Sequence, residues 1–357
     1  MRLSKEILYH KPVSHGGLFS IKNPNSEILD FSSNISPIGP PPLVKKYLKQ
    51  NINTLEIYPD SDSTEVRKNL QRYTKIPSSH IVAGNGATEI IYNFCQAFLS
   101  KKTKVLIPIP TFGEYEAAVK LHGSKISYFK TMNLNNDLEE FIKIIPKNGC
   151  IFLCNPNNPT GVLVPKKILK KIIDSAAKKK TLIFVDECFI ELVPKSDESV
   201  SKLVKQFDNL FVLRSLTKSF GLAGIRIGYA LGPKNFIDTL NKIKIPWNVS
   251  GLAQKAANAA VCHSFHIEKA KKIIKKESSF LRKEISNIEG FECHDTTTNF
   301  ILIKTKSNSK TIQNKLLKKN ILVRDCSSFR GLGRNYIRIA VRTRNENKKL
   351  IQAMKTI

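Results

Sequence analysis

The sequence predicts an α/β protein, in which a large domain holds a mostly parallel seven-stranded sheet between helices and a smaller α+β domain is attached to it. Seven short apolar runs lie between residues 80 and 231 and alternate with helical patterns. The runs are rich in β-branched residues and lack strict apolar–polar alternation, which is typical of parallel strands buried on both faces. After Pro246 the pattern changes, and 357 residues are enough for two domains.

The expected elements of the large domain follow each other in chain order. The strands are HIVAGNG (80–86), TKVLIPIP (103–110), SKISYF (124–129), CIFLCNP (150–156), TLIFVDE (181–187), LFVLRSL (210–216) and IRIGYAL (225–231). Helices are expected at 87–99, 113–121, 136–145 and 165–178. Because the connection between the last strands is short, one of them is expected to run antiparallel to the rest.

The smaller domain is predicted from the remaining segments. A long amphipathic region at 249–289 precedes NFILIKT (299–305), a helix at 308–319, ILVRD (321–325), YIRIAVR (336–342) and a final helix. The first 48 residues, rich in Pro, Ser and Asn, are expected to form an arm that rejoins this unit. The predicted domains are therefore 49–248, and 1–48 together with 249–357, with a cleft between them.

The composition restricts the class of protein. No apolar run reaches about 18 residues, and the N-terminus lacks the apolar core of a signal peptide, so we expect a cytoplasmic protein without membrane contact. Seven scattered cysteines form no CxxC pair and no metal-ligand spacing. This usage indicates free thiols in a reducing compartment and no metal site.

The net charge of +29 comes mostly from lysine, with 46 Lys against 12 Arg. Lysine-rich helical stretches such as KKILKKIIDSAAKKK (166–180) are interpreted as solvated faces, so no nucleic-acid partner is expected. Six of the 12 arginines lie between 324 and 344. Because arginine makes two-point contacts with carboxylate and phosphate, this cluster favours a small anionic substrate.

Residues that can bind a ligand follow the ends of the expected strands, where ligands of open α/β sheets lie beside helix N-termini. These segments are GNGATE (84–89), PTFGEY (110–115), NPNNPTG (155–161), VDE (185–187) and SLTKSFGLAGIRIGY (215–229). They contain an aromatic ring (Phe112), a carboxylate (Asp186) and a lysine (Lys218). Glu187, beside Asp186, is expected to brace the strand end rather than act as an acid.

Together these segments indicate pyridoxal 5'-phosphate as cofactor. Its aldehyde condenses with a lysine amine as a Schiff base, and an aspartate paired with the ring nitrogen keeps that nitrogen protonated. An aromatic side chain stacks on the ring. Backbone N–H groups, hydroxyls and an arginine bind the phosphate, and an asparagine can donate a hydrogen bond to the phenolic oxygen.

Four segments, NPNNPTG, VDE, SLTKSFGLAGIRIGY and YIRIAVRT, occur in an order and spacing that resemble the fold-type I pyridoxal-phosphate enzymes, the aspartate aminotransferase superfamily. The resemblance covers essentially the whole chain and implies Lys218 as Schiff-base lysine and proton shuttle. It implies Asp186, Asn158 and Phe112 as partners of the ring nitrogen, the phenolic oxygen and the ring face. It assigns the cofactor phosphate to Ala87, Thr88, Ser215, Thr217 and Arg226, the substrate α-carboxylate to Arg338, and the neighbouring subunit's cofactor phosphate to Tyr58 in a homodimer with shared active sites.

Two subfamilies are similar to the sequence: histidinol-phosphate aminotransferases and the threonine-phosphate decarboxylases of cobalamin biosynthesis. HGG (15–17), ILDFSSNISPIGPP (28–41), IPWNVSGLAQ (245–254) and RDCSSFRGLG (324–333) resemble the decarboxylases, and Phe189 stands where the aminotransferases usually carry tyrosine. The favoured function is decarboxylation of L-threonine O-3-phosphate to 1-amino-2-propanol O-2-phosphate. The alternatives are an aminotransferase acting on histidinol phosphate or a related amino acid and, outside the enzymes, a basic nucleic-acid-binding protein.

A second anion site is expected for the phosphate of the substrate. HGG and the arginine cluster motivate the candidates His15, the backbone of Gly16 and Gly17, Ser36, Arg324 and Arg330, which join Arg338 and Asn158 as the substrate-binding set. The reaction depends on which covalent bond of the substrate's Cα is held perpendicular to the cofactor ring. A perpendicular bond to the carboxylate carbon leads to decarboxylation, and a perpendicular Cα–H bond leads to transamination. The sequence leaves that angle open.

Overall fold

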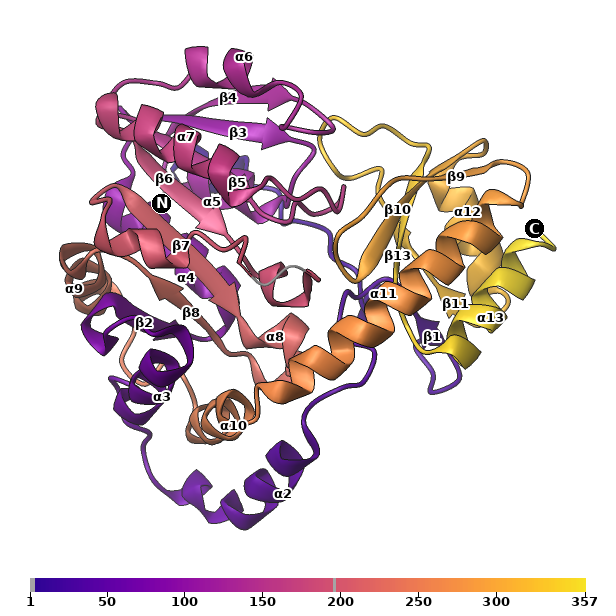
Figure 1. The fold of residues 1–357 in the computed structure, drawn as a ribbon, viewed down its shortest axis with the longest axis horizontal. Helices are drawn as coiled ribbons and strands as arrows, with labels where there is room; N and C mark the ends of the chain where they lie inside the picture. Colours follow the sequence, from indigo (N-terminus) through magenta and orange to yellow (C-terminus); the bar gives the residue numbers. More distant parts are fainter. Residues whose placement is uncertain (1–3, 195–196) are drawn as a thin grey trace.

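The computed structural model describes residues 4–194 and 197–357, which form a large α/β unit and a smaller α+β unit (Figure 1). The large sheet has seven strands. In spatial order they are β2 (Ile81–Gly84), β8 (Gly228–Leu231), β7 (Leu210–Ser215), β6 (Leu182–Asp186), β5 (Cys150–Cys154), β3 (Lys104–Ile109) and β4 (Lys125–Lys130). Strand β8 is antiparallel to both neighbours, and every other pairing is parallel. The predicted fold class, with one antiparallel strand among the last, is confirmed.

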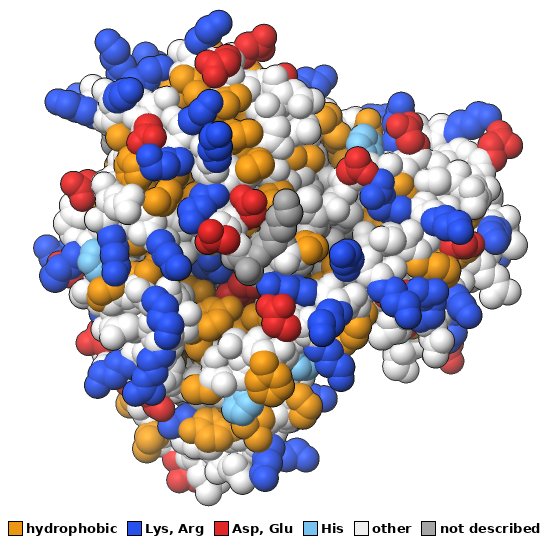
Figure 2. Space-filling model, in the orientation of Figure 1, with side chains coloured by type: hydrophobic (Ala, Val, Ile, Leu, Met, Phe, Trp, Pro, Cys, Tyr) orange, Lys and Arg blue, Asp and Glu red, His pale blue; other side chains and the backbone are white. Residues whose placement is uncertain are grey.

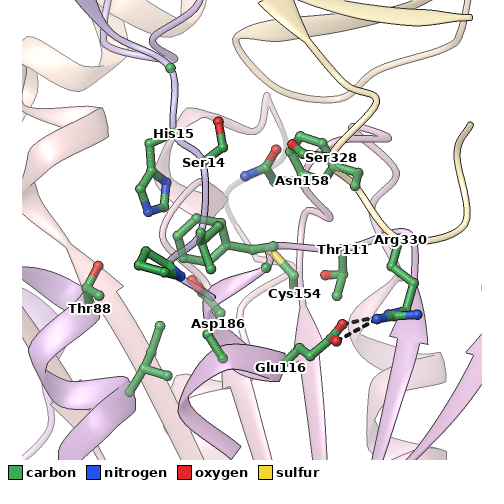
Figure 3. Close-up of a pocket in the computed structure, with 18 of the residues that line it drawn as sticks. Ser14, His15, Thr88, Thr111, Glu116, Cys154, Asn158, Asp186, Ser328 and Arg330 are labelled. Atoms are coloured by element: carbon green, nitrogen blue, oxygen red, sulfur yellow. Dashed lines mark hydrogen bonds and ion pairs between the residues drawn. The ribbon is translucent and has the colours of Figure 1, made fainter. Parts of the chain in front are cut away.

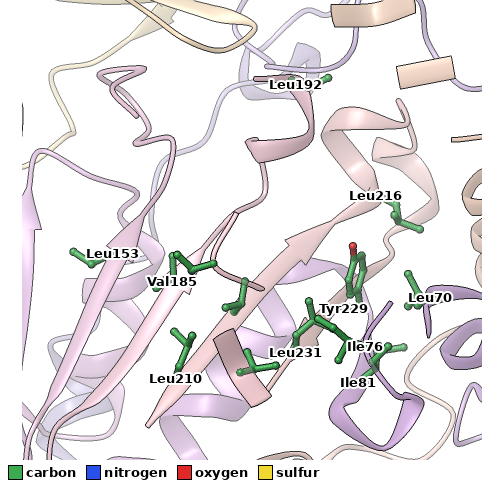
Figure 4. Packing of buried hydrophobic residues seen from close by; sticks show 14 of the residues in the cluster. Leu70, Ile76, Ile81, Leu153, Val185, Leu192, Leu210, Leu216, Tyr229 and Leu231 are labelled. Carbon is green, nitrogen blue, oxygen red and sulfur yellow. The ribbon is translucent and has the colours of Figure 1, made fainter. Parts of the chain in front are cut away.

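Helices cover both faces of this sheet because its strands are apolar on both sides. In β6, Ile183 and Val185 pack into one hydrophobic cluster, while Phe184 between them packs into another. The first cluster, part of which is drawn in Figure 4, includes residues of α3 (Thr64–Thr74), α7 (Lys166–Lys178) and α10 (Gly251–Cys262). The second includes residues of α4 (Gly86–Phe98), α5 (Glu114–Leu121) and α9 (Lys234–Ile243).

The smaller unit is built on a four-stranded antiparallel sheet with helices against it. Its strands are, in spatial order, β12 (Arg324–Asp325), β13 (Tyr336–Ala340), β10 (Phe300–Thr305) and β9 (Phe291–Cys293), and its helices include α12 (Ser309–Leu317) and α13 (Arg344–Met354). Helix α11 (Phe265–Ser286) joins the two units. Its residue Ile274 is buried in the large unit's core, and Leu281 is buried in the small unit's core.

The N-terminal arm pairs with a strand that follows α12. Strand β1 (Leu29–Asp30) pairs in parallel with β11 (Ile321–Leu322). Earlier in the arm, α1 (Lys5–Leu8) contacts α5, and the Glu6 carboxylate lies 2.8 Å from Lys101 Nζ. Val13 packs so closely on Gly113 that a Cβ there would lie 3.0 Å from its methyl group. The arm is therefore held against both units.

The structure corrects one of the expected elements and divides another region into two helices. The run 321–325 is two strands rather than one, because β11 pairs with the arm and β12 pairs with β13. The region 249–289 is two helices, α10 and α11, separated at His263 and Ser264. Helix α10 packs against α3 and α2 (Pro42–Gln50), so it belongs with the large unit by its contacts. The predicted boundary at residue 249 stays a prediction.

The surface carries the basic charge in scattered form. In Figure 2, lysine and arginine side chains are distributed over the whole visible face, with acidic side chains between them. Among the described residues, none of the helices combines the length and the apolar character that a membrane crossing needs. All seven cysteines are free thiols.

Candidate active site

A cleft of about 1520 Å³ opens at the carboxyl ends of the large sheet's strands and reaches the small unit and the N-terminal arm (Figure 3). It brings together fourteen of the residues that the sequence singled out. They are His15, Gly16, Ala87, Thr88, Phe112, Asn158, Asp186, Ser215, Thr217, Lys218, Arg226, Arg324, Arg330 and Arg338. The residues come from strand ends, from a helix start and from loops far apart in sequence, because parallel strands present their carboxyl ends at one edge.

The first turn of α4 and Arg226 form a cradle in the cleft wall whose donor groups are suited to an anion. Gly86 has φ +79°, and a Cβ there would lie 2.5 Å from a terminal nitrogen of Arg226. A Cβ on Gly228 would lie 2.6 Å from the Ala87 backbone nitrogen. Glycine at position 86 therefore leaves room for the Arg226 guanidinium, and glycine at position 228 leaves room for the backbone at the start of α4. The N–H groups of a helix start and a guanidinium bind phosphate.

Asp186 ends β6 and is nearly fully buried, with 4% of its surface exposed. The Tyr115 hydroxyl donates to Asp186 Oδ2 at 2.6 Å, and the Cys188 backbone N–H donates to Oδ1 at 2.9 Å. Burial raises the pKa of this carboxyl above its usual value, although both hydrogen bonds oppose the change. A cation placed against the carboxylate would stabilise its charge, so the position suits a protonated ring nitrogen.

Lys218 lies in α8 (Leu216–Ser219), the one-turn helix that follows β7. Burial, and then the positive charge of Arg338, lower the pKa of its amine to about 8. Ser215 begins the helix, and its hydroxyl accepts from the Thr217 backbone N–H at 3.1 Å. An amine with this pKa is partly neutral near pH 8, which is the form that attacks an aldehyde.

Arg338 lies on β13 at the small-unit wall of the cleft and is 6% exposed. Its Nη1 donates to Asn158 Oδ1, and its Nη2 donates to the Ser32 carbonyl at 2.8 Å. Its Nε is buried and has no hydrogen-bond partner among the described residues. Burial lowers the pKa of Arg338 to about 10. A buried guanidinium with a free donor is a ready partner for a carboxylate.

His15 and Phe112 meet where the arm crosses the cleft, with ring centroids 5.9 Å apart. His15 Nε2 lies 2.6 Å from Glu114 Oε1, and the Tyr92 hydroxyl donates to Glu114 Oε2 at 2.7 Å. Burial would raise the pKa of Glu114, but the hydrogen bonds from His15 and Tyr92 lower it. The histidine ring is thus held over the cleft by an ionised partner.

The two arginines of RDCSSFRGLG have different partners. Arg324 Nη2 donates to the Ser14 carbonyl at 2.6 Å and to Ser328 Oγ at 2.9 Å, so it joins the small unit to the arm. Arg330 makes a two-point ion pair with Glu116 on α5, with both N–O distances 2.7 Å (Figure 3). Arg330 therefore joins the small unit to the large one.

The sequence and fold match known proteins over nearly the whole chain. Residues 26–354 match the aminotransferase class I and II family model. A protein from Caldanaerobacter subterraneus, provisionally named a threonine-phosphate decarboxylase, is 37% identical over 97% of this chain and 94% of its own. The histidinol-phosphate aminotransferase of Methanococcoides burtonii is 34% identical over 93% and 91%. The chain belongs to the aminotransferase class I and II family.

Solved structures agree with this assignment. The L-threonine-O-3-phosphate decarboxylase of Porphyromonas gingivalis has a TM-score of 0.85 and 26% identity, covering 92% of this chain and 99% of that one. A histidinol-phosphate aminotransferase of Sinorhizobium meliloti, solved with pyridoxal-5'-phosphate, shares the fold with a TM-score of 0.86 and 20% identity, covering 99% of this chain and 96% of that one. Pyridoxal 5'-phosphate is the cofactor of this aminotransferase-family chain.

The residues present suit that cofactor. The cradle of α4 and Arg226 would hold its phosphate, Asp186 its ring nitrogen and Lys218 its aldehyde, and these groups all line one cleft. Gly86 and Gly228 keep the cradle open for the cofactor phosphate, because a Cβ at either position would occupy it.

Three predicted residues are not in the cleft wall. The Gly17 backbone N–H donates to Ser32 Oγ at 2.7 Å, and the Ser36 backbone N–H donates to the Lys218 carbonyl at 3.0 Å, so both hold the arm rather than face the cleft. Tyr58 is 80% exposed and stacks on Trp247 with ring centroids 4.7 Å apart. Its role toward a neighbouring subunit stays a prediction.

Four cleft residues or their partners were not predicted from the sequence. They are Tyr115, Glu114, Glu116 and Asn34, whose Oδ1 is buried and has no hydrogen-bond partner in the part of the chain that the structure describes. Tyr115 follows Phe112 by three residues in PTFGEY, in the first turn of α5 just after the strand end, and this position is a usable signal. The pairing of Glu116 with Arg330, 214 residues away, leaves no such local signal.

Proposed function

We propose that this family member decarboxylates L-threonine O-3-phosphate to 1-amino-2-propanol O-2-phosphate and carbon dioxide. The observation that carries the proposal is that two separate groups of cationic and hydrogen-bond-donating residues line the cleft besides the cofactor cradle. Arg338 stands at one, and the HGG segment with Arg324 stands at the other. A substrate with one carboxylate and one phosphate would occupy both. The product's place in cobalamin biosynthesis rests on this substrate.

The cofactor, when bound, supplies the electron sink for a bond broken at the substrate's Cα. In this proposal Arg338 fixes the carboxylate through two-point contact, using the Nε that has no partner among residues 4–194 and 197–357. Lys218 returns a proton to Cα after carbon dioxide leaves, a task for which an amine with a pKa of about 8 is suitable near neutral pH. Asp186 stabilises positive charge on the ring nitrogen.

The phosphate of the substrate is assigned to the arm side of the cleft. Arg324 already contacts the arm at the Ser14 carbonyl, and the Glu114 carboxylate orients His15. Gly16 follows His15 and packs so closely on Ser32 that a Cβ on Gly16 would lie 2.8 Å from the Ser32 carbonyl oxygen. The arm thus offers backbone and imidazole donors beside a guanidinium, which is a typical phosphate-binding set.

Phe189 favours the decarboxylase over the aminotransferase. It lines the cleft, is 5% exposed and packs edge-on against Phe300 with centroids 5.1 Å apart. It gives no hydroxyl to the cofactor's phenolic oxygen, so Asn158 is the assigned partner. The alternative, transamination of histidinol phosphate, is supported by the relative that is 34% identical.

Two parallel reactions test the proposal with purified, cofactor-loaded protein. The first offers L-threonine O-3-phosphate without any oxo acid and follows carbon dioxide and 1-amino-2-propanol phosphate. The second offers histidinol phosphate with 2-oxoglutarate and follows glutamate. Carbon dioxide in the first alone supports the decarboxylase. Glutamate in the second alone replaces it with the aminotransferase.

The role of Arg330 needs its own test because Glu116 already occupies its guanidinium. Hydrogen bonds from Arg330 and Lys120 outweigh burial and lower the pKa of Glu116 to about 2, so the pair persists at neutral pH. If Arg330 binds substrate phosphate, Arg330→Ala raises KM for the phosphorylated substrate and leaves cofactor absorbance intact. Glu116→Gln, which frees Arg330, should lower that KM. Equal KM values in both variants and the wild type remove Arg330 from the site.

We further propose a homodimer in which Tyr58 reaches the cofactor phosphate of the other subunit. Its support is an exposed apolar patch around Tyr58, formed by Leu55, Ile57, Ile245 and Trp247, each at least 50% exposed. Patches of this kind mark interaction sites. Trp247→Ser should raise the dimer dissociation constant in analytical ultracentrifugation. Phe265→Ser, an exposed aromatic outside the patch, is the control.

A cytoplasmic location and the absence of a nucleic-acid partner also stay predictions. Elution of the protein from heparin at a position independent of salt would support the absence of a nucleic-acid partner.

A further inference from the structure

A buried charge network lies next to the cleft, on the face of the large sheet that is opposite the Asp186 side chain. Arg214 on β7 is its centre and is 7% exposed. Its Nε donates to Glu187 Oε2 at 2.9 Å, and its Nη1 donates to Glu191 Oε1 at 3.3 Å. Its Nη2 donates to Ser199 Oγ at 2.8 Å, so all three nitrogens of the guanidinium are used.

Each of the two carboxylates in the network is connected to a sequence neighbour of one residue proposed for catalysis. Glu187 follows Asp186 at the end of β6, where the alternation of the strand turns Glu187 to the face opposite Asp186. Glu191 Oε2 accepts a hydrogen bond from the hydroxyl of Ser219, which follows Lys218. Through Arg214, the network therefore connects the backbone of Asp186 with the backbone of Lys218.

We propose that Glu187, Arg214, Glu191 and Ser219 form a positioning element that fixes Lys218 relative to Asp186. The inference rests on the proposed roles of these two residues, and it applies to both reactions named above. Helix α8 has only four residues, and a helix of this length does not hold its own geometry. Ser215 fixes its start, and the Ser219–Glu191 hydrogen bond fixes its end. The lysine lies between these two fixed points.

The network offers a matched pair of variants. Glu191 accepts hydrogen bonds from two hydroxyls, those of Ser219 and of Tyr73, the latter at 2.9 Å from Oε1. Tyr73 lies on α3, far from Lys218 in the sequence, whereas Ser219 is the next residue after Lys218. Ser219→Ala and Tyr73→Phe each remove one hydroxyl from the same carboxylate. A purely structural network would respond to both alike, whereas a positioning element would respond at the cofactor to Ser219→Ala only.

The readout is the visible absorbance of the cofactor bound to Lys218, titrated with pH, together with kcat and KM. The charged groups that act on Lys218 are Arg338, Arg226, Asp30 and Asp186, the thiol of Cys188 also faces it, and neither variant changes these residues. For Ser219→Ala we expect the absorbance pKa to shift by roughly half a unit or more and kcat to fall about tenfold at nearly unchanged KM, because small misplacements of reacting groups cost rate. Tyr73→Phe should match the wild type in both, with a comparable loss of Tm.

Equal absorbance pKa values in the two variants, whether shifted or not, would overturn the proposal. If Ser219→Ala does not fold, Glu191→Gln replaces it, since the amide keeps the volume and changes the contact with Ser219, and it should shift the absorbance pKa likewise. The absorbance titration needs no substrate. A protein that shows the expected shift but turns over neither test substrate would therefore leave the positioning element standing and refute the proposed function alone.

Discussion

Replacing Lys218 by methionine should stabilise the protein in its cofactor-free form. Burial and the charge of Arg338 lower the pKa of Lys218 from 10.5 to about 8. Between these two pH values the unfolded chain keeps a proton that the folded chain has released, so stability rises with pH through this window. Below pH 8 the folded protein carries the full cost of a charged amine in an unfavourable place, and methionine removes that cost.

The magnitude follows from the pKa difference. At 1.36 kcal/mol per pKa unit the shift corresponds to about 3 kcal/mol. Lys218 also lines a cleft that water enters, and its exposure is intermediate, so solvent reduces the expected gain to about 2 kcal/mol at pH 7.

Urea unfolding of the cofactor-free wild type and of Lys218→Met, at pH 7 and at pH 10.5, measures this gain. The variant should be more stable by about 2 kcal/mol at pH 7, and the difference should shrink at pH 10.5, where the folded wild-type amine is neutral and the unfolded one has lost about half of its protons. A variant no more stable than the wild type at pH 7, or a difference that does not change with pH, would refute the reasoning.

Three further predictions concern cofactor and substrate binding. Arg338→Lys should lower kcat/KM about ten- to a hundredfold, since lysine cannot make the two-point contact; steady-state kinetics with an unchanged cofactor spectrum checks it. Asp186→Asn should cost about 2 to 5 kcal/mol in cofactor affinity, measured by equilibrium dialysis, and unchanged affinity would remove the ion pair with the ring nitrogen. Gly86→Ala should weaken cofactor binding, because φ is +79° there and the new Cβ would lie 2.5 Å from Arg226. Gly224→Ala, with no atom within 4 Å of its Cβ, is the control and should bind normally.

The sequence was most informative where function follows from topology. Strands that are apolar on both faces predicted a parallel sheet, and the carboxyl ends of such strands meet at one edge. Asp186 and Lys218 could therefore be placed in one cleft without knowledge of the side-chain packing. The antiparallel direction of β8 followed from the short connection before it.

Contacts between segments far apart in the sequence could not be predicted from local sequence patterns. The Arg324 guanidinium reaches the Ser14 carbonyl, 310 residues away, and nothing near either residue indicates this pairing. The run ILVRD was read as one strand because it is continuously apolar before its charged end. Its division at Val323 arises because the arm pairs with the first half only. Long-range pairing thus decided both the arm's path and the partner of each arginine.

Helix α11 has a thermodynamic consequence for the whole chain. One side of this 22-residue helix is buried at Ile267 and Ile274 in the core of the large unit, and further along it is buried at Leu281 and Ile285 in the core of the small unit. Fraying of the helix would expose apolar surface in both cores at once. We therefore expect the two units to unfold in one cooperative transition, and we expect a fragment that ends before α11 to lack part of the large unit's core.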